Sequence, residues 1–173
     1  VLAAEATEMA PSPDGEEVAF VVRGDVFVAS VKHGTTKRVT DTPAQERMIA
    51  WQPDGKRLYF AGERDGSWNL YAAAPARAGE KRLSRATLVA ETVVLATPAE
   101  EFEPVPSPDG KLLAFVRDRD EVAALTLATG EVRTLLSAAR NVSYTDGDIG
   151  LAWSPDGRWL AATALDTGRW TSS

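Results

Sequence analysis

The sequence predicts an all-β fold, a β-propeller of about three and a half four-stranded antiparallel blades. The first observation is a four-residue turn that recurs four times, with its aspartates, Asp14, Asp54, Asp109 and Asp156, separated by 40, 55 and 47 residues. A repeat of roughly 40–50 residues built on strands is typical of propeller blades. The second observation is an apolar strand pattern after each turn, and the third is a further hairpin after most of these strands.

Each turn reads Ser-Pro-Asp-Gly, except that Gln52 replaces the serine of the second copy. Proline fixes the φ angle that a type I turn needs at its second position, and the closing glycine can adopt positive φ. We therefore expect each turn to join two antiparallel strands, with the serine hydroxyl bonding back to the turn backbone. Gln52 is the one departure from this pattern.

The residues four and six positions after each turn aspartate share one face of the expected strand, because side chains alternate between the two faces. These positions hold Val18, Leu58, Leu113 and Leu160, then Phe20, Phe60, Phe115 and Ala162. The strands that enter the turns are expected at about 5–10, 47–52, 102–106 and 150–154. The first strand of each blade lines the central channel of a propeller, so these four strands are expected to line a pore.

A second hairpin follows the first three apolar strands, with turns at 23–25, 65–67 and 118–120. Third strands are then expected at 26–29, 68–71 and 122–125, and polar outer strands at about 35–40, 80–84 and 131–136. The longer spacing before the third turn is interpreted as an insertion near 86–104, with a longer outer strand and a loop. The blades of this single domain are thus expected at about 1–41, 42–85, 86–138 and 139–173, the last one incomplete.

The fourth blade has no outer strand in the sequence, because only three residues follow the segment 166–170. Closed propellers typically have four to eight blades, so the chain is expected to be about half of a larger propeller. Unpaired strand edges would then be covered by the missing domains of a longer chain or by a second copy in a homo-oligomer. The chain also begins at Val1 rather than Met, which favours a processed or partial chain.

The composition excludes several classes of function. The chain has 173 residues and a formal net charge of −6, and it lacks the basic stripe of a nucleic-acid-binding protein. It has no cysteine, which excludes disulfides and cysteine-ligated metals. No apolar run reaches the roughly 18–20 residues of a membrane span. A cytoplasmic and a periplasmic or other extracytoplasmic location are both compatible with the sequence, and no cofactor is expected.

The histidine and the clustered carboxylates are interpreted as turn and loop residues rather than as catalytic or metal-binding groups. His33 is the only histidine and lies in a polar turn, so neither a Ser-His-Asp triad nor a zinc site is expected. The carboxylates within 118–121 and 146–148 lack the spacing of a calcium loop and are interpreted as turn residues. The acidic run Glu100, Glu101 and Glu103 is interpreted as a solvated loop, with a negative channel rim that favours basic peptides as the alternative.

Tryptophans supply the candidate binding residues. Most of the five are expected to pack between blades. Trp51 and Trp153 lie three residues before their turn aspartates and end strands expected to line the channel. They are therefore the expected contacts for a peptide or another channel ligand. No catalytic, cofactor-binding or metal-ligating residue is predicted.

Several longer strings, at 7–15, 18–28, 34–40, 45–47, 63–71, 144–148 and 153–157, resemble the N-terminal propeller of tricorn-type serine proteases. The likeness covers nearly the whole chain, whereas the Ser-Pro-Asp-Gly turn by itself is shared with TolB-like and prolyl-oligopeptidase-type propellers. The resemblance implies a large multidomain peptidase in which a non-catalytic propeller delivers peptides to a C-terminal catalytic core. No catalytic motif of that family matches any position of this sequence.

Two functions from different classes follow. The first is a non-catalytic propeller segment of a tricorn-like serine peptidase, which gives structural support and peptide access to a catalytic core outside this chain. Its partners would be peptides and the missing domains. The second is a TolB-like interaction module that docks a protein partner. An enzyme with its active site in the channel is a weaker third possibility, because clustered histidines are lacking.

Overall fold

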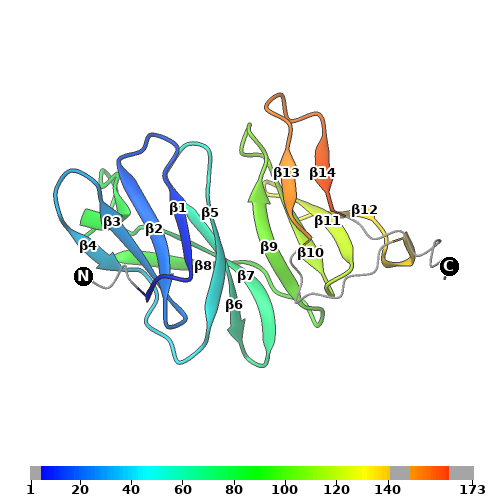
Figure 1. Ribbon diagram of the computed structural model, residues 1–173, viewed down its shortest axis with the longest axis horizontal. Helices are drawn as coiled ribbons and strands as arrows, with labels where there is room; N and C mark the ends of the chain where they lie inside the picture. The colour runs from blue at the N-terminus through cyan, green and yellow to red at the C-terminus, as the bar shows by residue number, and fades with distance from the viewer. Residues whose placement is uncertain (1–4, 141–148, 164–173) are drawn as a thin grey trace, which may run out of the picture.

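A computed structural model describes residues 5–140 and 149–163 of the chain. Within these ranges the strands form three four-stranded antiparallel sheets and one two-stranded sheet, and each sheet takes its strands in chain order (Figure 1). Blade 1 contains β1 (Glu8–Pro11), β2 (Glu17–Val22), β3 (Asp25–Ser30) and β4 (Thr36–Arg38). Blade 2 contains β5 (Glu46–Trp51), β6 (Leu58–Arg64), β7 (Ser67–Pro75) and β8 (Val89–Leu95). Blade 3 contains β9 (Glu101–Pro106), β10 (Leu112–Arg117), β11 (Glu121–Thr126) and β12 (Val132–Leu136), and blade 4 contains β13 (Leu151–Trp153) and β14 (Leu160–Ala162).

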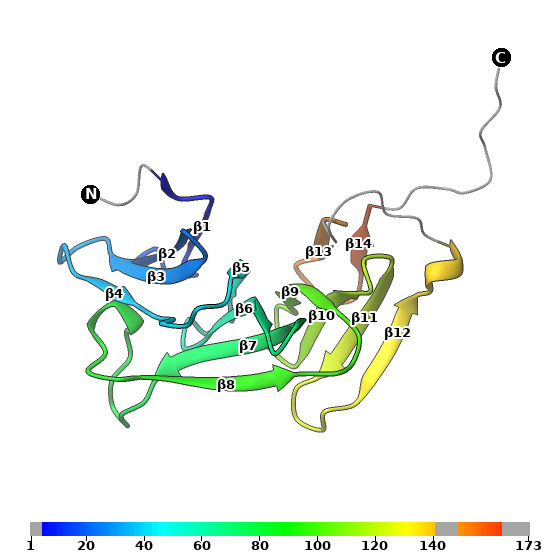
Figure 2. The same cartoon turned by 90° about the horizontal axis from the view of Figure 1, so that it is seen from below.

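This arrangement confirms the predicted all-β fold with a partial propeller. Figure 1 shows the first strands of the blades, β1, β5, β9 and β13, following one another across the middle of the molecule, and successive ones are in contact. Figure 2 shows the fourth strands, β4, β8 and β12, at the outside. The entering, second and third strands lie within a few residues of their predicted places.

The Ser-Pro-Asp-Gly turns close the first hairpin of each blade as predicted. In blade 3, the Ser107 hydroxyl donates to the Asp109 carboxylate at 2.7 Å and accepts the Leu112 N–H at 2.9 Å. The Asp109 carboxylate also accepts the Lys111 N–H at 3.1 Å. Gly110 closes the turn at a φ of 69°, a region that L side chains rarely adopt. The serine–aspartate pairs of blades 1 and 4 repeat these bonds.

Gln52 changes the turn of blade 2 without abolishing it. The Asp54 carboxylate still accepts the Lys56 N–H at 2.9 Å, and Gly55 still closes the turn at a φ of 69°. The Gln52 side-chain carbonyl instead accepts the Tyr59 hydroxyl at 3.0 Å. The longer side chain therefore reaches the following strand rather than the turn backbone.

The outer strand of blade 2 is β8, so the predicted outer strand at 80–84 and the blade boundary at residue 85 are wrong. β8 pairs with β7 along its length, from Leu70 opposite Leu95 to Pro75 opposite Val89. Residues 76–88 form a loop with one turn of 3-10 helix, η2 (Leu83–Arg85). The insertion thus precedes the outer strand. Leu83 is buried by tertiary packing although it lies outside any strand.

The 76–88 loop ties blade 2 to the outside of blade 1, and it lies beside β4 in Figure 2. The Ser84 N–H donates at 2.7 Å to the carboxylate of Glu17, which is itself buried in β2. Leu83 packs into the apolar core shared by blades 1 and 2. The Lys37 ammonium donates to the Thr87 carbonyl at 3.3 Å. The insertion therefore contributes to the joint between the first two blades.

Two apolar cores fill the spaces between the blades. One joins blades 1 and 2 and includes Val21, Val28, Phe60 and Tyr71. The other runs from blade 2 through blade 3 to blade 4. Five consecutive residues are buried in β6 (58–62) and four in β10 (113–116), so both faces of these strands are covered.

Candidate functional site

The inner strands of successive blades meet at one repeated position, six residues before the turn aspartate. Met48 and Glu103 occupy it in β5 and β9 with positive φ angles of 58° and 49°, and Gly150 occupies it before β13 with a φ of 69°. The pairing of β5 with β6, and of β9 with β10, shifts register there. A bulge with one residue in the left-handed region points successive N–H groups to one side, which forms a concavity suited to anions.

In the joint between blades 1 and 2, a carboxylate fills this concavity. Glu8, at the equivalent position of blade 1, accepts the N–H groups of Met48 at 2.7 Å and Ile49 at 3.2 Å. A further bond runs in the same direction, from the Trp51 indole N–H of blade 2 to the Ala10 carbonyl of blade 1 at 3.0 Å. Blade 2 therefore supplies all three donors and blade 1 the acceptors, and these bonds hold the two inner strands in a fixed register.

The joint between blades 3 and 4 repeats the same device. The Glu103 carboxylate accepts the N–H groups of Leu151 at 2.8 Å and Gly150 at 3.2 Å. The Trp153 indole N–H donates to the Val105 carbonyl at 3.0 Å. The residue types, donors and acceptors match those of the first joint, so one carboxylate and one indole connect the blades in both places.

The joint between blades 2 and 3 is built differently. Met48 stands at the carboxylate position, and its thioether sulfur accepts only the Glu103 N–H, at 3.1 Å. The next residue, Pro104, has no N–H to offer a second bond. Pro106 stands where the other two joints have tryptophan. A thioether is a weak acceptor, so this joint lacks the polar connection of its neighbours.

An aromatic and cationic cluster holds blades 2 and 3 together instead. The rings of Trp68 and Phe102 lie 5.7 Å apart between centroids. The Arg47 guanidinium lies 4.3 Å from the Trp68 ring and 5.4 Å from the Phe102 ring. Cation–π and ring contacts of this kind replace the carboxylate and indole of the other joints.

Both tryptophans predicted to contact a ligand thus lie in blade joints. Trp51 is 7% exposed, and Trp153 is half-buried. Trp68 also packs between blades, as expected of most tryptophans, whereas Trp159 is 71% exposed. Trp170 lies outside the described residues. Contact of Trp51 and Trp153 with a peptide stays a prediction, and the half-buried Trp153 ring is the better placed of the two.

That two kinds of blade joint alternate along the chain was not predicted from the sequence, although the sequence carries a signal for it. The turns of blades 1 and 3 are preceded by a shared pattern, Glu-x-x-Pro, at 8–11 and 103–106. The turns of blades 2 and 4 are preceded by Ala-Trp at 50–51 and 152–153. The pattern therefore repeats every two blades. The first blade of each pair carries the carboxylate, and the second carries the indole.

A second repeated motif, Thr-Pro-Ala-x-Glu, precedes the inner strands of blades 2 and 3 at 42–46 and 97–101. The Thr42 hydroxyl donates to the Glu46 carboxylate at 2.6 Å, and the Thr97 hydroxyl donates to the Glu101 carboxylate. Each threonine oxygen also accepts the N–H two residues later. In each blade the motif places a threonine-bonded, fully buried glutamate at the start of the inner strand.

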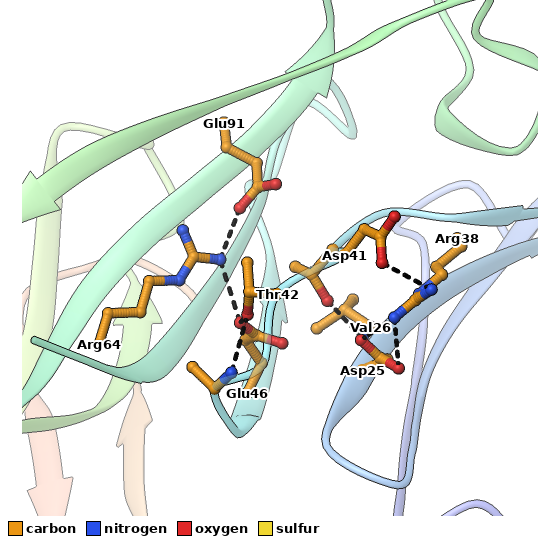
Figure 3. A network of polar contacts seen from close by, with 10 residues as sticks. Asp25, Val26, Arg38, Asp41, Thr42, Glu46, Arg64 and Glu91 are labelled. Atoms are coloured by element: carbon orange, nitrogen blue, oxygen red, sulfur yellow. Dashed lines mark hydrogen bonds and ion pairs between the residues drawn. The ribbon is translucent and has the colours of Figure 1, made fainter.

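The two buried glutamates have different neighbours. Figure 3 shows the Arg64 guanidinium between the carboxylates of Glu46, at 3.1 Å, and Glu91, at 2.6 Å. The same view shows Arg38 bound to both Asp25 and Asp41, near the start of the segment that leads into blade 2. For Glu101, by contrast, burial raises the carboxyl pKa, and the hydrogen bonds from Thr97 only partly offset this.

A pH-dependent stability follows from Glu101. Because its pKa is raised above the usual 4.5, the folded chain binds this proton more tightly than the unfolded chain. The contribution of Glu101 to the free energy of unfolding is present below the usual pKa of a glutamate and is lost as pH rises through the raised pKa of the folded state. Between about pH 4 and about pH 7, the free energy of unfolding should therefore fall more in the wild type than in Glu101→Gln.

Chemical denaturation at a series of pH values measures this difference. Glu46→Gln is the matched control, since it alters the same motif position but weakens the ion pair with Arg64. That control should lose stability near neutral pH. Parallel pH profiles for the wild type and Glu101→Gln would contradict the assignment.

The acidic run is not the predicted solvated loop. Glu100 pairs with Arg119 at 3.1 Å, Glu101 is fully buried, and Glu103 connects blades 3 and 4. These residues enter or form strand β9, and local sequence could not reveal partners that come from other strands and blades. The predicted turn at 118–120 and the exposed turn position of His33 are confirmed, whereas residues 146–148 lie outside the described residues.

No group of three or more His, Cys, Asp or Glu side chains suited to a metal ion occurs in the part of the chain that the structure describes. Over the same residues, no helix has both the length and the apolar character needed to cross a membrane.

Comparison with known proteins gives the same architecture. A family profile described as the TolB β-propeller domain (PD40) matches residues 2–160. Dipeptidyl-peptidase 5 from Porphyromonas gingivalis is 32% identical over 74 residues, which are 37% of this chain and 11% of that protein.

Two solved structures show the fold alone, because their identities to this chain are low. The TolB structure from Acinetobacter baumannii is 22% identical, with a TM-score of 0.64 over 88% of this chain and 36% of that one. Oligogalacturonate lyase from Vibrio parahaemolyticus is 13% identical, with a TM-score of 0.57 over 84% of this chain and 41% of that one. The chain therefore spans less than half the length of these proteins.

Proposed function

The chain belongs to the TolB β-propeller domain family, and from this premise we propose that it is a non-catalytic propeller segment of a tricorn-like serine peptidase. Its role is to support a catalytic core carried elsewhere and to admit peptide substrates to it. The observation that carries the proposal is the use of the inner-strand side chains. Glu8, Trp51, Glu103 and Trp153 bond neighbouring blades to one another, which suits a rigid wall beside a passage.

The stretch shared with a dipeptidyl-peptidase supports the link to peptide hydrolysis. Its coverage is limited to 37% of the chain, so it supports the class of reaction rather than a particular enzyme. Within the passage, the half-buried Trp153 ring is the proposed contact for an incoming peptide, because an indole offers a large apolar face.

Kinetics of the full-length protein test this role. Trp153→Ala should raise KM for peptides of about ten residues while leaving kcat/KM for a dipeptide reporter unchanged, because only long substrates need the passage. The control is Trp159→Ala, which removes an exposed indole from the neighbouring strand region of the same blade. Equal losses on both substrates, or a full-length protein without peptidase activity, would overturn the proposal.

A second candidate is a TolB-like interaction module that docks a protein partner. The observation in its favour is coverage, since the likeness to a TolB structure extends over 88% of the chain. Under this alternative, the full-length protein would hydrolyse neither substrate and would instead form a stable complex of defined mass with a protein from its own cell. Peptide hydrolysis that depends on Trp153 would count against it.

A further inference from the structure

The insertion in blade 2 builds a groove at the turn edge of the propeller. The third and fourth strands are connected by the short segments 31–35 in blade 1 and 127–131 in blade 3. In blade 2 they are connected by the 76–88 loop. The groove has a volume of about 560 Å³ and lies between the turn residues 54–57, the end of β7 at 74–75 and the loop residues 79–82. A smaller recess of about 350 Å³ is lined by residues 79–82 and Arg85.

Exposed cations line this groove from two separate elements. Lys56 and Arg57 come from the turn of blade 2 and Lys81 from the inserted loop, and Arg85 of the same loop lines the smaller recess. Neither loop cation forms an ion pair with a carboxylate among the residues that the structure describes. Lys56 has only a long contact of 3.8 Å with Asp54. This cationic surface stands on a chain whose net charge is −6.

Three carboxylates, Asp14, Asp54 and Glu80, also line the groove, and each accepts hydrogen bonds from other groups of the chain. Arg82 donates at 2.6 Å to Asp14 and at 2.7 Å to Glu16, which holds the loop against the turn of blade 1. The Glu16 N–H, the Arg82 guanidinium and the Ser12 hydroxyl donate to the Asp14 carboxylate and lower its pKa to about 2. Glu80 accepts the N–H and hydroxyl of Thr87 within the loop. Because Asp14 is paired with Arg82, the four cations Lys56, Arg57, Lys81 and Arg85 remain in excess over the two carboxylates Asp54 and Glu80.

We propose that this groove binds an acidic, extended peptide segment of a partner protein. Lys56 and Arg57 on one side and Lys81 and Arg85 on the other would contact its carboxylates, while Ala74 and Pro75 offer an apolar floor between them. The open shape and the separation of the cations on two elements suit a chain with several carboxylates better than a single small anion. The aromatic platforms that stack nucleic-acid bases do not line the groove.

Fluorescence anisotropy with the full-length protein tests the proposal. The probe is a labelled, C-terminally amidated peptide of four Glu-Gly repeats, and its affinity should fall as salt is added because the contacts are between exposed charges. Lys81→Glu combined with Arg85→Glu should weaken binding about tenfold. The matched control is Lys111→Glu, which reverses an exposed charge at the equivalent turn position of blade 3 and should leave binding unchanged.

Several results would overturn the proposal. Equal binding of a peptide of four Lys-Gly repeats would exclude charge recognition, and unchanged affinity in the double variant would place binding elsewhere. Full competition by inorganic phosphate at the peptide's own concentration would make the groove a small-anion site. Tighter binding of single-stranded RNA would make it a nucleic-acid site. Trp153 does not line this groove, so failure of the groove proposal would not contradict the proposed role of Trp153 in peptide access.

Discussion

Replacing Glu8 with alanine is expected to lower the free energy of unfolding by about 2–3 kcal/mol. The substitution leaves the N–H groups of Met48 and Ile49 without their acceptor at a partly buried joint. Bulging of β5 has already removed both groups from the ladder with β6, so no neighbouring strand can accept them. Hydrogen bonds to a charged acceptor are also stronger than neutral ones. Urea denaturation of the domain measures the change.

Two variants control for effects other than the lost acceptor. Met9→Ala removes a side chain that is 70% exposed from the next position of the same strand, and it should change stability by less than about 0.5 kcal/mol. Glu8→Gln keeps an oxygen acceptor but no charge, so its loss should fall between those of Met9→Ala and Glu8→Ala. Equal stability of all three variants would show that the carboxylate does not hold the joint.

Replacing Trp51 with alanine should have a larger effect, a loss of about 3–5 kcal/mol, because it empties a buried site as large as an indole. The ring packs in the core shared by blades 1 and 2, and its N–H also bonds to the Ala10 carbonyl at 3.0 Å. Trp51→Phe keeps most of the packing and removes only that bond, so we expect a smaller loss of about 1 kcal/mol.

The comparison with Trp159 makes the Trp51 result interpretable. Trp159 is 71% exposed, and Trp159→Ala should cost less than about 0.5 kcal/mol. Thermal or chemical denaturation followed by circular dichroism avoids dependence on tryptophan fluorescence, which both substitutions alter. Similar losses for Trp51→Ala and Trp159→Ala would contradict the packing described for the first joint.

Much of the fold could be predicted because its signals are local. The Ser-Pro-Asp-Gly turn fixes a hairpin by the chemistry of four adjacent residues, and Leu58 and Phe60 mark a buried face by their spacing alone. The outer strand of blade 2 could not be placed in this way. Leu83 is buried because a loop folds back on the neighbouring blade, and no local pattern distinguishes such a residue from one in a strand.

The blade joints depend on pairs of residues about 40–50 positions apart, which a single sequence does not connect. Glu8 looks like an ordinary surface residue until its carboxylate is seen beside the N–H groups of the next inner strand. Glu103 likewise belongs to an acidic run that reads as a solvated loop. The two-blade pattern of Glu-x-x-Pro and Ala-Trp was the one available signal, and its meaning requires the joint geometry.

The three blade joints differ in the kinds of contact that hold them. Blades 1 and 2 share two hydrogen-bonded connections and the inserted loop, and blades 3 and 4 share the two connections. Blades 2 and 3 rely on apolar and cation–π contacts around Trp68 and Phe102. Apolar contacts are less directional than hydrogen bonds, so the relative position of blades 2 and 3 depends on side-chain packing.

Amide hydrogen exchange at the inner strands, resolved by residue, tests the central claim most directly. The claim is that Glu8 and Glu103 lock alternate joints. The N–H groups of Met48, Ile49 and Leu151, which donate to carboxylates, should exchange far more slowly than the N–H of Glu103, which donates to the Met48 thioether. Exchange of Met48, Ile49 and Leu151 as fast as that of Glu103 would contradict it.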